Sequence, residues 1–104
     1  MTGGEDGKME GGWVYMMASK PHGVVYVGVT ADLAARVTQH RAGEGSSFCK
    51  RYNCTRLDYA EPHGTILEAI AREKAVKKWP RRWKLNLIVE SNPEWKDLYE
   101  TLNH

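Results

Sequence analysis

The chain has 104 residues and a formal net charge of +2, and 41% of its residues are hydrophobic and 27% charged. Such a length suits one compact domain with a modest core, and no apolar run approaches the roughly 20 residues that a transmembrane helix needs. These properties exclude a membrane-spanning protein and, with only two cysteines, a disulfide-stabilised secreted scaffold, so we expect a globular protein located in the cytoplasm.

The N-terminal segment MTGGEDGKMEGG is rich in glycine and acidic residues and lacks the apolar stretch of a signal peptide. We expect residues 1–11 to form a flexible leader and residues 12–104 to form one domain. Strands are predicted over residues 13–18 and 24–29, because both segments are rich in Val, Tyr and Met. The turn-forming string SKPHG lies between them, so the two strands should pair as an antiparallel hairpin.

A helix is predicted over residues 31–41, where apolar residues recur at helical spacing. Thr30 is expected to cap its N-terminus, and Asp32 is expected in its first turn near the positive end of the helix dipole. The string AGEGSS should end this helix, and a basic loop should follow it.

A third, weaker strand is expected over residues 56–61, in which Leu57 and Tyr59 should share one face. Together with the hairpin it would complete the sheet. The predicted fold is therefore an α/β domain in which a small antiparallel sheet of about three strands is flanked by helices.

The clearest helical pattern is TILEAIAREKAVKKW, in which Thr65 and Glu68 form a capping box. Pro80 should end this helix and begin a short one through RRWKLNLIV, for which a strand is the alternative. The string SNPEWKDLYETL predicts a C-terminal helix with Asn92 as its N-cap and Pro93 at its first position. The apolar stripe of that helix would comprise Trp95, Leu98, Tyr99 and Leu102.

Polar side chains interrupt the apolar faces of the predicted elements. Hairpin pairing should bring Tyr15 and Tyr26 close together. Arg36 and His40 are four residues apart, so they should project from the same side of the first helix. Glu73 lies on the stripe of the long helix, where an apolar residue would be expected. Four of these residues also have a structural interpretation: packing for the two tyrosines, dipole compensation for the histidine, and covering of apolar neighbours for the arginine.

These residues form a set of motifs: WVY and YVG in the hairpin, an arginine and a histidine on the next helix, and a glutamate in AIAREKAVKKW. Over residues 12–91 the chain resembles the GIY-YIG nuclease superfamily, and most closely its small single-domain bacterial members. Trp13 stands where the family pattern has glycine, and Val14 and Val27 replace isoleucine.

The resemblance implies a GIY-YIG endonuclease-like fold and metal-dependent cleavage of phosphodiester bonds in DNA. One Mg²⁺ or Mn²⁺ ion would be held by Glu73, since Mg²⁺ keeps several waters and takes few protein carboxylates. Arg36 would clamp the phosphate, and Tyr15 would act as general base once nearby cations had lowered its pKa. Tyr26 would orient the water or the phosphate, and His40 would either relay a proton or form a hydrogen bond to a tyrosine or to the phosphate.

Basic residues mix with aromatic ones in KRYNCTR and in REKAVKKWPRRWK. Such cations neutralise phosphates, although solvated lysine-rich helix faces are common in proteins that bind nothing acidic. The nucleic-acid-binding residues predicted from this pattern are Lys50, Arg51, Lys77, Lys78, Arg81 and Arg82. The substrate would be DNA, branched or single-stranded, with RNA as an alternative.

The alternative to an endonuclease is a DNA- or RNA-binding module of the same fold that has lost useful turnover and acts with a partner protein. A homodimer would suit an enzyme of this size that cuts both strands. Asn92 is left out of the predicted catalytic set, because N-capping accounts for it.

Overall fold

Three antiparallel strands form the centre of the structure, a computed structural model that describes residues 11–103. They are β1 (Gly12–Ala18), β2 (Val25–Thr30) and β3 (Arg56–His63), and β1 lies in the middle of the order β2-β1-β3. β1 and β2 pair as the predicted hairpin, which is confirmed. Apart from Gly11, the predicted leader lies outside the described residues, and the division into a leader and one domain stays a prediction.

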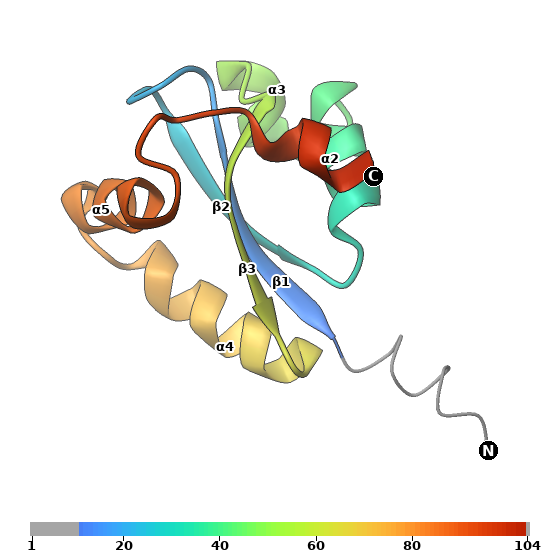
Figure 1. The fold of residues 1–104 in the computed structure, drawn as a ribbon. Coiled ribbons are helices and arrows are strands. Elements are labelled where there is room, and N and C mark those ends of the chain that lie inside the picture. The colour runs from blue at the N-terminus through green and yellow to red at the C-terminus, as the bar shows by residue number, and fades with distance from the viewer. Residues whose placement is uncertain (1–10, 104) are drawn as a thin grey trace.

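Helices cover both faces of this sheet (Figure 1). On one face lie α4 (Ile66–Lys77) and α5 (Arg81–Ser91), and on the other lie α2 (Leu33–Arg41), α3 (Ser47–Tyr52) and the 3₁₀ helix η1 (Leu98–Asn103). The predicted α/β fold, a three-stranded antiparallel sheet flanked by helices, is confirmed. Among residues 11–103, no helix combines the length and the apolar character needed to cross a bilayer.

The central strand β1 supplies both hydrophobic cores. Val14 and Met16 point toward α4 and α5, whereas Tyr15 and Met17 point toward α2 and α3. Successive side chains of a strand alternate between faces, and both faces of this strand are covered, so β1 is apolar along its length. Each fully buried valine or methionine contributes about 1.5–3 kcal/mol to stability.

A β-bulge at Asp58 interrupts the pairing of β3 with β1. Met17 pairs with Leu57 and Met16 pairs with Tyr59, so Asp58 has no partner on β1. The inserted residue sends Leu57 to the core beneath α2 and α3 and Tyr59 to the core beneath α4 and α5. The prediction that Leu57 and Tyr59 share one face is therefore wrong, because it assumed unbroken alternation along the strand.

Two helix starts differ from the sequence predictions. The N-cap of α2 is Asp32, whose side chain accepts a hydrogen bond from the Ala35 amide at 3.1 Å. Thr30, the predicted cap, instead ends β2 and accepts a hydrogen bond from the Asp32 amide at 3.0 Å. The segment predicted as a basic loop is the helix α3, capped by Ser46. So short a helix is marginal by itself, and burial of Cys49 beneath it provides the tertiary contact that stabilises it.

The two helices after β3 follow the sequence predictions. Thr65 caps α4 by accepting a hydrogen bond from the Glu68 amide at 3.1 Å. α5 is a helix and not the alternative strand, and Pro80 occupies its N-cap position. Proline cannot donate an amide hydrogen bond, so it prevents α4 from continuing while it suits the start of α5.

The predicted C-terminal helix exists only as the 3₁₀ helix η1 over Leu98–Asn103, so its predicted start at Asn92 is wrong. Asn92 is the C-cap of α5, and Trp95 adopts a left-handed backbone conformation with φ of 53°. The Asn92 side chain accepts a hydrogen bond from the Lys96 amide at 3.0 Å and donates one to the Asp58 carbonyl at 3.2 Å. Asn92 therefore closes a turn against the bulge of β3, and this structural role replaces the predicted N-cap.

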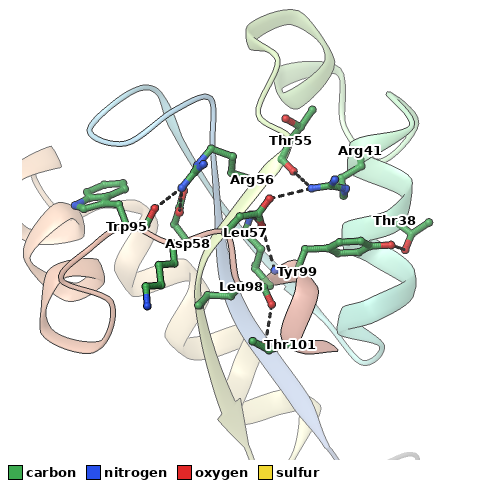
Figure 2. A network of polar contacts seen from close by, with 12 residues as sticks. Thr38, Arg41, Thr55, Arg56, Leu57, Asp58, Trp95, Leu98, Tyr99 and Thr101 are labelled. Carbon is green, nitrogen blue, oxygen red and sulfur yellow. Dashed lines mark hydrogen bonds and ion pairs between the residues drawn. The ribbon is translucent and has the colours of Figure 1, made fainter. Parts of the chain in front are cut away.

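Polar contacts attach the C-terminal segment to the sheet and to α2 (Figure 2). Asp97 accepts a hydrogen bond from a backbone amide of β3 at 3.1 Å and forms an ion pair with Arg41 at 3.0 Å. Arg56 donates to the Trp95 carbonyl and lies 3.4 Å from Asp58. The predicted apolar stripe is split by this path, with Trp95 in the core beneath α5 and with Leu98, Tyr99 and Leu102 against the core beneath α2.

Candidate active site

Two tyrosines of the hairpin lie on the face of the sheet that α2 covers. Tyr15 is opposite Gly28 and Tyr26 is opposite Met17, a diagonal arrangement that puts both phenol rings on the same face. Their ring centroids are 6.4 Å apart. Tyr15, on the central strand, is fully buried, and Tyr26, on the edge strand, is half-buried. The prediction that hairpin pairing brings the two tyrosines together is confirmed.

Gly28 leaves the space that the Tyr15 ring occupies. A Cβ atom on residue 28 would lie 2.8 Å from Cε1 of Tyr15 and closer still to Cζ and the hydroxyl oxygen. The ring lies in a close-packed core and cannot retreat from such a contact. The third position of the YVG motif is therefore glycine for a steric reason.

The Tyr15 hydroxyl is paired with His40 of α2. The Tyr15 Oη atom lies 2.8 Å from Nε2 of His40, whose ring centroid is 5.3 Å from that of Tyr26. His40 is 2% exposed, and its Nδ1 atom has no hydrogen-bond partner within the described part of the chain. A Cβ atom on Gly45 would lie 2.6 Å from that Nδ1. Compensation of the helix dipole is thus not enough to explain why this position is a histidine, because the His40 ring is buried against two phenol rings.

Arg36, one turn before His40, acts on both members of this pair. Burial and the neighbouring Tyr26 raise the pKa of Tyr15 above its ordinary value, and the Arg36 guanidinium opposes that rise without outweighing it. Burial lowers the pKa of His40, and Arg36 lowers it further. At neutral pH the pair is therefore a neutral phenol beside a neutral imidazole. The expectation that neighbouring cations lower the Tyr15 pKa is not met by the protein's own groups.

Glu73 is linked to the tyrosines through Lys77. It is 7% exposed on α4, and its Oε2 atom lies 2.6 Å from Nζ of Lys77, one turn later. The same ammonium lies 5.9 Å from the centroid of the Tyr26 ring. Glu73 and Tyr26 thus approach one cation beside the edge strand β2. Of the predicted catalytic residues, the structure gathers Tyr15, Tyr26, Arg36 and His40 into one cluster and connects Glu73 to that cluster by way of Lys77.

Glu73 suits a hydrated cation and not an enclosed metal site. Within residues 11–103, no group of three or more His, Cys, Asp or Glu side chains is arranged to hold a metal ion. Mg²⁺ usually keeps several waters and takes one or two protein carboxylates, so a single buried carboxylate is a suitable donor. Lys77 already neutralises this carboxylate, and its side chain is half exposed, so it is able to turn into solvent.

The predicted nucleic-acid-binding residues have different surroundings. Lys50 and Arg51 are exposed on α3, and Lys78 and Arg82 are exposed near the junction of α4 and α5. None of these four lies in the buried cluster, so they form two separate basic regions.

Arg81 has a structural role that the sequence did not predict. Its Nη2 atom donates to the carbonyl oxygens of His22 and Gly23 at 2.9 and 2.8 Å. These bonds fasten the β1–β2 turn to the start of α5. The prediction that Arg81 belongs with the nucleic-acid-binding residues receives no support from these contacts, because its guanidinium is already engaged.

Sequence reasoning also missed two neighbours of the cluster. The Phe48 ring of α3 packs against Tyr26 with ring centroids 5.9 Å apart, but its segment was predicted to be a loop. Lys77 was predicted to contact nucleic acid, whereas here it pairs with Glu73. The spacing of four residues between Glu73 and Lys77 is the signal that would have found this pair.

Known proteins resemble this chain over most of its length. The family model described as GIY-YIG catalytic domain matches residues 11–86. The chain belongs to this family. Relatives of this GIY-YIG domain include the proteins named UPF0213 protein from Staphylococcus aureus strains Mu3, Mu50 and N315. Each is 35% identical over 82 residues, which cover 79% of this chain and 99% of the relative. No solved structure matches the chain.

Membership in the GIY-YIG family indicates a nuclease domain and a nucleic-acid substrate. The names of the relatives state no activity, so metal dependence, turnover and the kind of nucleic acid are matters for proposal. A homodimer and a cytoplasmic location stay predictions.

Gly12 lies where α4 approaches the sheet closely. A Cβ atom on Gly12 would lie 2.9 Å from Cβ of Ala69 and 2.9 Å from Cδ1 of Ile66. The corner between β1 and α4 therefore has no room for a side chain at residue 12. Trp13, the next residue, packs on the other face of the sheet, against the core beneath α2.

Proposed function

We propose that this GIY-YIG domain is a divalent-metal-dependent endonuclease that hydrolyses phosphodiester bonds in DNA. The observation that carries the proposal is the pairing of Tyr15 Oη with His40 Nε2 at 2.8 Å, with the Tyr26 ring beside both. A hydroxyl held on a neutral imidazole is able to pass a proton, and Arg36 adds the positive charge that a phosphate requires.

Tyr26 and Arg36 are the groups proposed to bind the scissile phosphate. Tyr26 is the more exposed of the two phenols, and Arg36 offers donors in a planar fork that matches two phosphate oxygens. The phosphoryl oxygens become more anionic in the transition state, so the Arg36 charge would stabilise that state more than the substrate.

The Tyr15–His40 pair is proposed to accept the proton of the attacking water. The water oxygen forms the new bond to phosphorus, and the bond between phosphorus and the leaving sugar oxygen breaks. The water proton passes to Oη of Tyr15 as the phenol proton passes to Nε2 of His40, and the leaving oxygen takes a proton from solvent. Because Tyr15 is fully buried, this step requires the side chains that cover its hydroxyl to move so that water reaches Oη.

Glu73 is proposed to hold the divalent ion through its carboxylate after Lys77 turns into solvent. The bound ion would supply positive charge at a phosphoryl oxygen and at the leaving oxygen.

Incubation with supercoiled and branched DNA in Mg²⁺ or Mn²⁺ tests the proposal. The wild type is expected to cut, and Arg36→Ala and Glu73→Gln are expected to reduce the rate by about 10²–10³. Glu90→Gln is the matched control, because Glu90 is an exposed carboxylate on α5 that contacts none of the cluster residues named above. Wild-type cutting by Glu73→Gln would contradict the metal role of Glu73.

The second candidate function is a DNA- or RNA-binding module of the same fold that turns over little and acts with a partner protein. It is favoured by the Glu73–Lys77 ion pair and the complete burial of Tyr15, which cover the reactive groups. Binding without metal-dependent cutting would support this function. In that case Arg36→Ala should weaken binding, whereas Glu73→Gln should leave it unchanged.

A further inference from the structure

The helix α3 presents two aromatic rings to solvent. Phe48 is 39% exposed and Tyr52 is 43% exposed, and their ring centroids lie 4.8 Å apart at an interplanar angle of 47°. Large aromatic side chains contribute most to stability when they are buried, so an exposed packed pair on a short helix has no evident folding role.

These rings extend the tyrosine cluster outward. Phe48 packs against Tyr26 at an interplanar angle of 32°, and Tyr26 contacts the buried Tyr15 and His40 rings. A continuous line of rings therefore leads from the buried hydroxyl to the surface of α3. Any group bound on Phe48 would lie next to a phosphate bound at Tyr26.

A surface hollow of about 320 Å³ lies along this helix, lined by Ser47, Phe48, Arg51 and Tyr52. Its volume is at the lower end of small-molecule sites and suits one planar ring system. The Arg51 guanidinium lies 5.5 Å from the Tyr52 ring centroid, which is the arrangement of a cation over an aromatic face.

The charge of α3 favours an anionic occupant. Lys50 and Arg51 are both exposed on this helix, and its sequence SFCKRY contains no acidic residue. Exposed aromatic rings beside cations suit nucleic acid, because each base offers a face for stacking and each linkage carries a negative phosphate.

We propose that α3 is a stacking subsite for one unpaired base of DNA next to the scissile phosphate. Phe48 and Tyr52 would receive the base, and Lys50 and Arg51 would hold the flanking phosphates. In a duplex the neighbouring base pairs cover both faces of every base, so such a subsite selects a single-stranded or extruded nucleotide. The position of the scissile phosphate rests on the proposed function, whereas the base-binding surface does not.

A second aromatic surface, formed by α5 and the segment just before it, provides a comparison. Trp79 and Trp83 line a hollow of about 370 Å³ there, together with Glu90. α5 covers the face of the sheet opposite to α3, so this surface lies away from the proposed subsite (Figure 1). Trp83, which is exposed, is therefore the matched control for loss of an aromatic ring.

Equilibrium binding of fluorescently labelled oligonucleotides in EDTA tests the proposal without any need for cleavage. Phe48→Leu and Tyr52→Leu are each expected to weaken single-strand binding about fivefold or more, since stacking on one ring is worth about that much. Phe48→Tyr should restore wild-type affinity, and Trp83→Leu should retain it. Duplex DNA of the same sequence should bind all five proteins equally, and thermal unfolding followed by circular dichroism checks that each variant folds.

Oligonucleotides with abasic sites give the sharper readout. Removal of the bases should abolish the difference in affinity between the wild type and Phe48→Leu, because the remaining phosphates contact only the cationic side chains. Equal affinity of wild type and both leucine variants for the single strand, or equal losses on single strand and duplex, would overturn the subsite. If no DNA is cut while the subsite pattern holds, the endonuclease proposal fails and the subsite stands. If DNA is cut but the leucine variants bind the single strand as tightly as the wild type, the subsite fails and the endonuclease proposal stands.

Discussion

Substitution of Gly28 by alanine tests the packing that holds the Tyr15 ring against His40. The new methyl group would lie 2.8 Å from Cε1 of Tyr15 and closer still to the hydroxyl end of the ring. Tyr15 is on the central strand and 0% exposed, so its ring has no free space to enter. The expected response is a displaced ring and a lengthened hydrogen bond to His40.

The expected loss in the free energy of unfolding is about 1–3 kcal/mol. Insertion of a methyl group into a filled core costs about 1–3 kcal/mol, and loss of one hydrogen bond adds about 1 kcal/mol. Alanine is favoured over glycine in a strand by roughly 0.5–1 kcal/mol, which offsets the hydrogen-bond contribution. For a chain of this length, the melting temperature should fall by about 5–20 °C.

Urea unfolding followed by circular dichroism measures this loss. Gly64→Ala is the matched control, because a Cβ atom on Gly64 would lie at an ordinary contact distance of 3.6 Å from Oε1 of Glu68. The control should change the free energy of unfolding by no more than about 0.5 kcal/mol.

A double-mutant cycle decides whether the Tyr15 ring causes the effect. In a Tyr15→Val background the ring is absent, so Gly28→Ala should lose most of its cost. If Gly28→Ala lowers the free energy of unfolding equally in the wild-type and Tyr15→Val backgrounds, the reasoning is refuted. An unchanged free energy of unfolding in the single variant Gly28→Ala would also refute it.

Three further predictions concern other parts of the molecule. Burial raises the pKa of Asp58 to about 6 against the opposing charge of a neighbouring arginine, so the folded protein keeps this proton at pH values where the unfolded chain has lost it. The free energy of unfolding should therefore fall by about 3 kcal/mol at most as pH rises from about 4 to about 6, and urea titrations of Asp58→Asn should lack this decrease. Tyr15→Phe leaves Nε2 of His40 without its partner, so it should lower stability by about 1–3 kcal/mol in urea unfolding and slow DNA cleavage about 10²-fold or more, and full activity would contradict the proton-transfer role. Arg81→Ala should speed amide hydrogen exchange at the β1–β2 turn and leave the salt dependence of DNA binding unchanged, whereas Arg82→Ala should reduce the salt slope by about 1 if that residue contacts a phosphate.

Part of the candidate site could be predicted from the sequence. The two tyrosines belong to strands joined by a short turn, and Arg36 and His40 lie one helical turn apart, so local geometry brings each pair together. The direct contact between Tyr15 and His40 joins two different elements, and its 2.8 Å separation depends on how α2 packs on the sheet.

The chemical state of the site could not be predicted in the same way. The sequence suggested that cations would lower the Tyr15 pKa, but the ring is fully buried and burial outweighs the Arg36 charge. Likewise, the pairing of Glu73 with Lys77 follows from their spacing, but the position of that pair beside Tyr26 follows only from the packing of α4 against β2.

The sequence by itself determined the hairpin, the long helix with its capping box, and the set of polar residues placed on apolar faces. Turn strings, capping side chains and hydrophobic periodicity act between near neighbours, so these features can be recognised without a fold. Only the tertiary structure decided the bulge at Asp58, the helix α3 and the turn that Asn92 closes. Each of these depends on burial and hydrogen bonds between residues distant in the chain, and such contacts outweigh the fraction of a kilocalorie per residue by which local propensities differ.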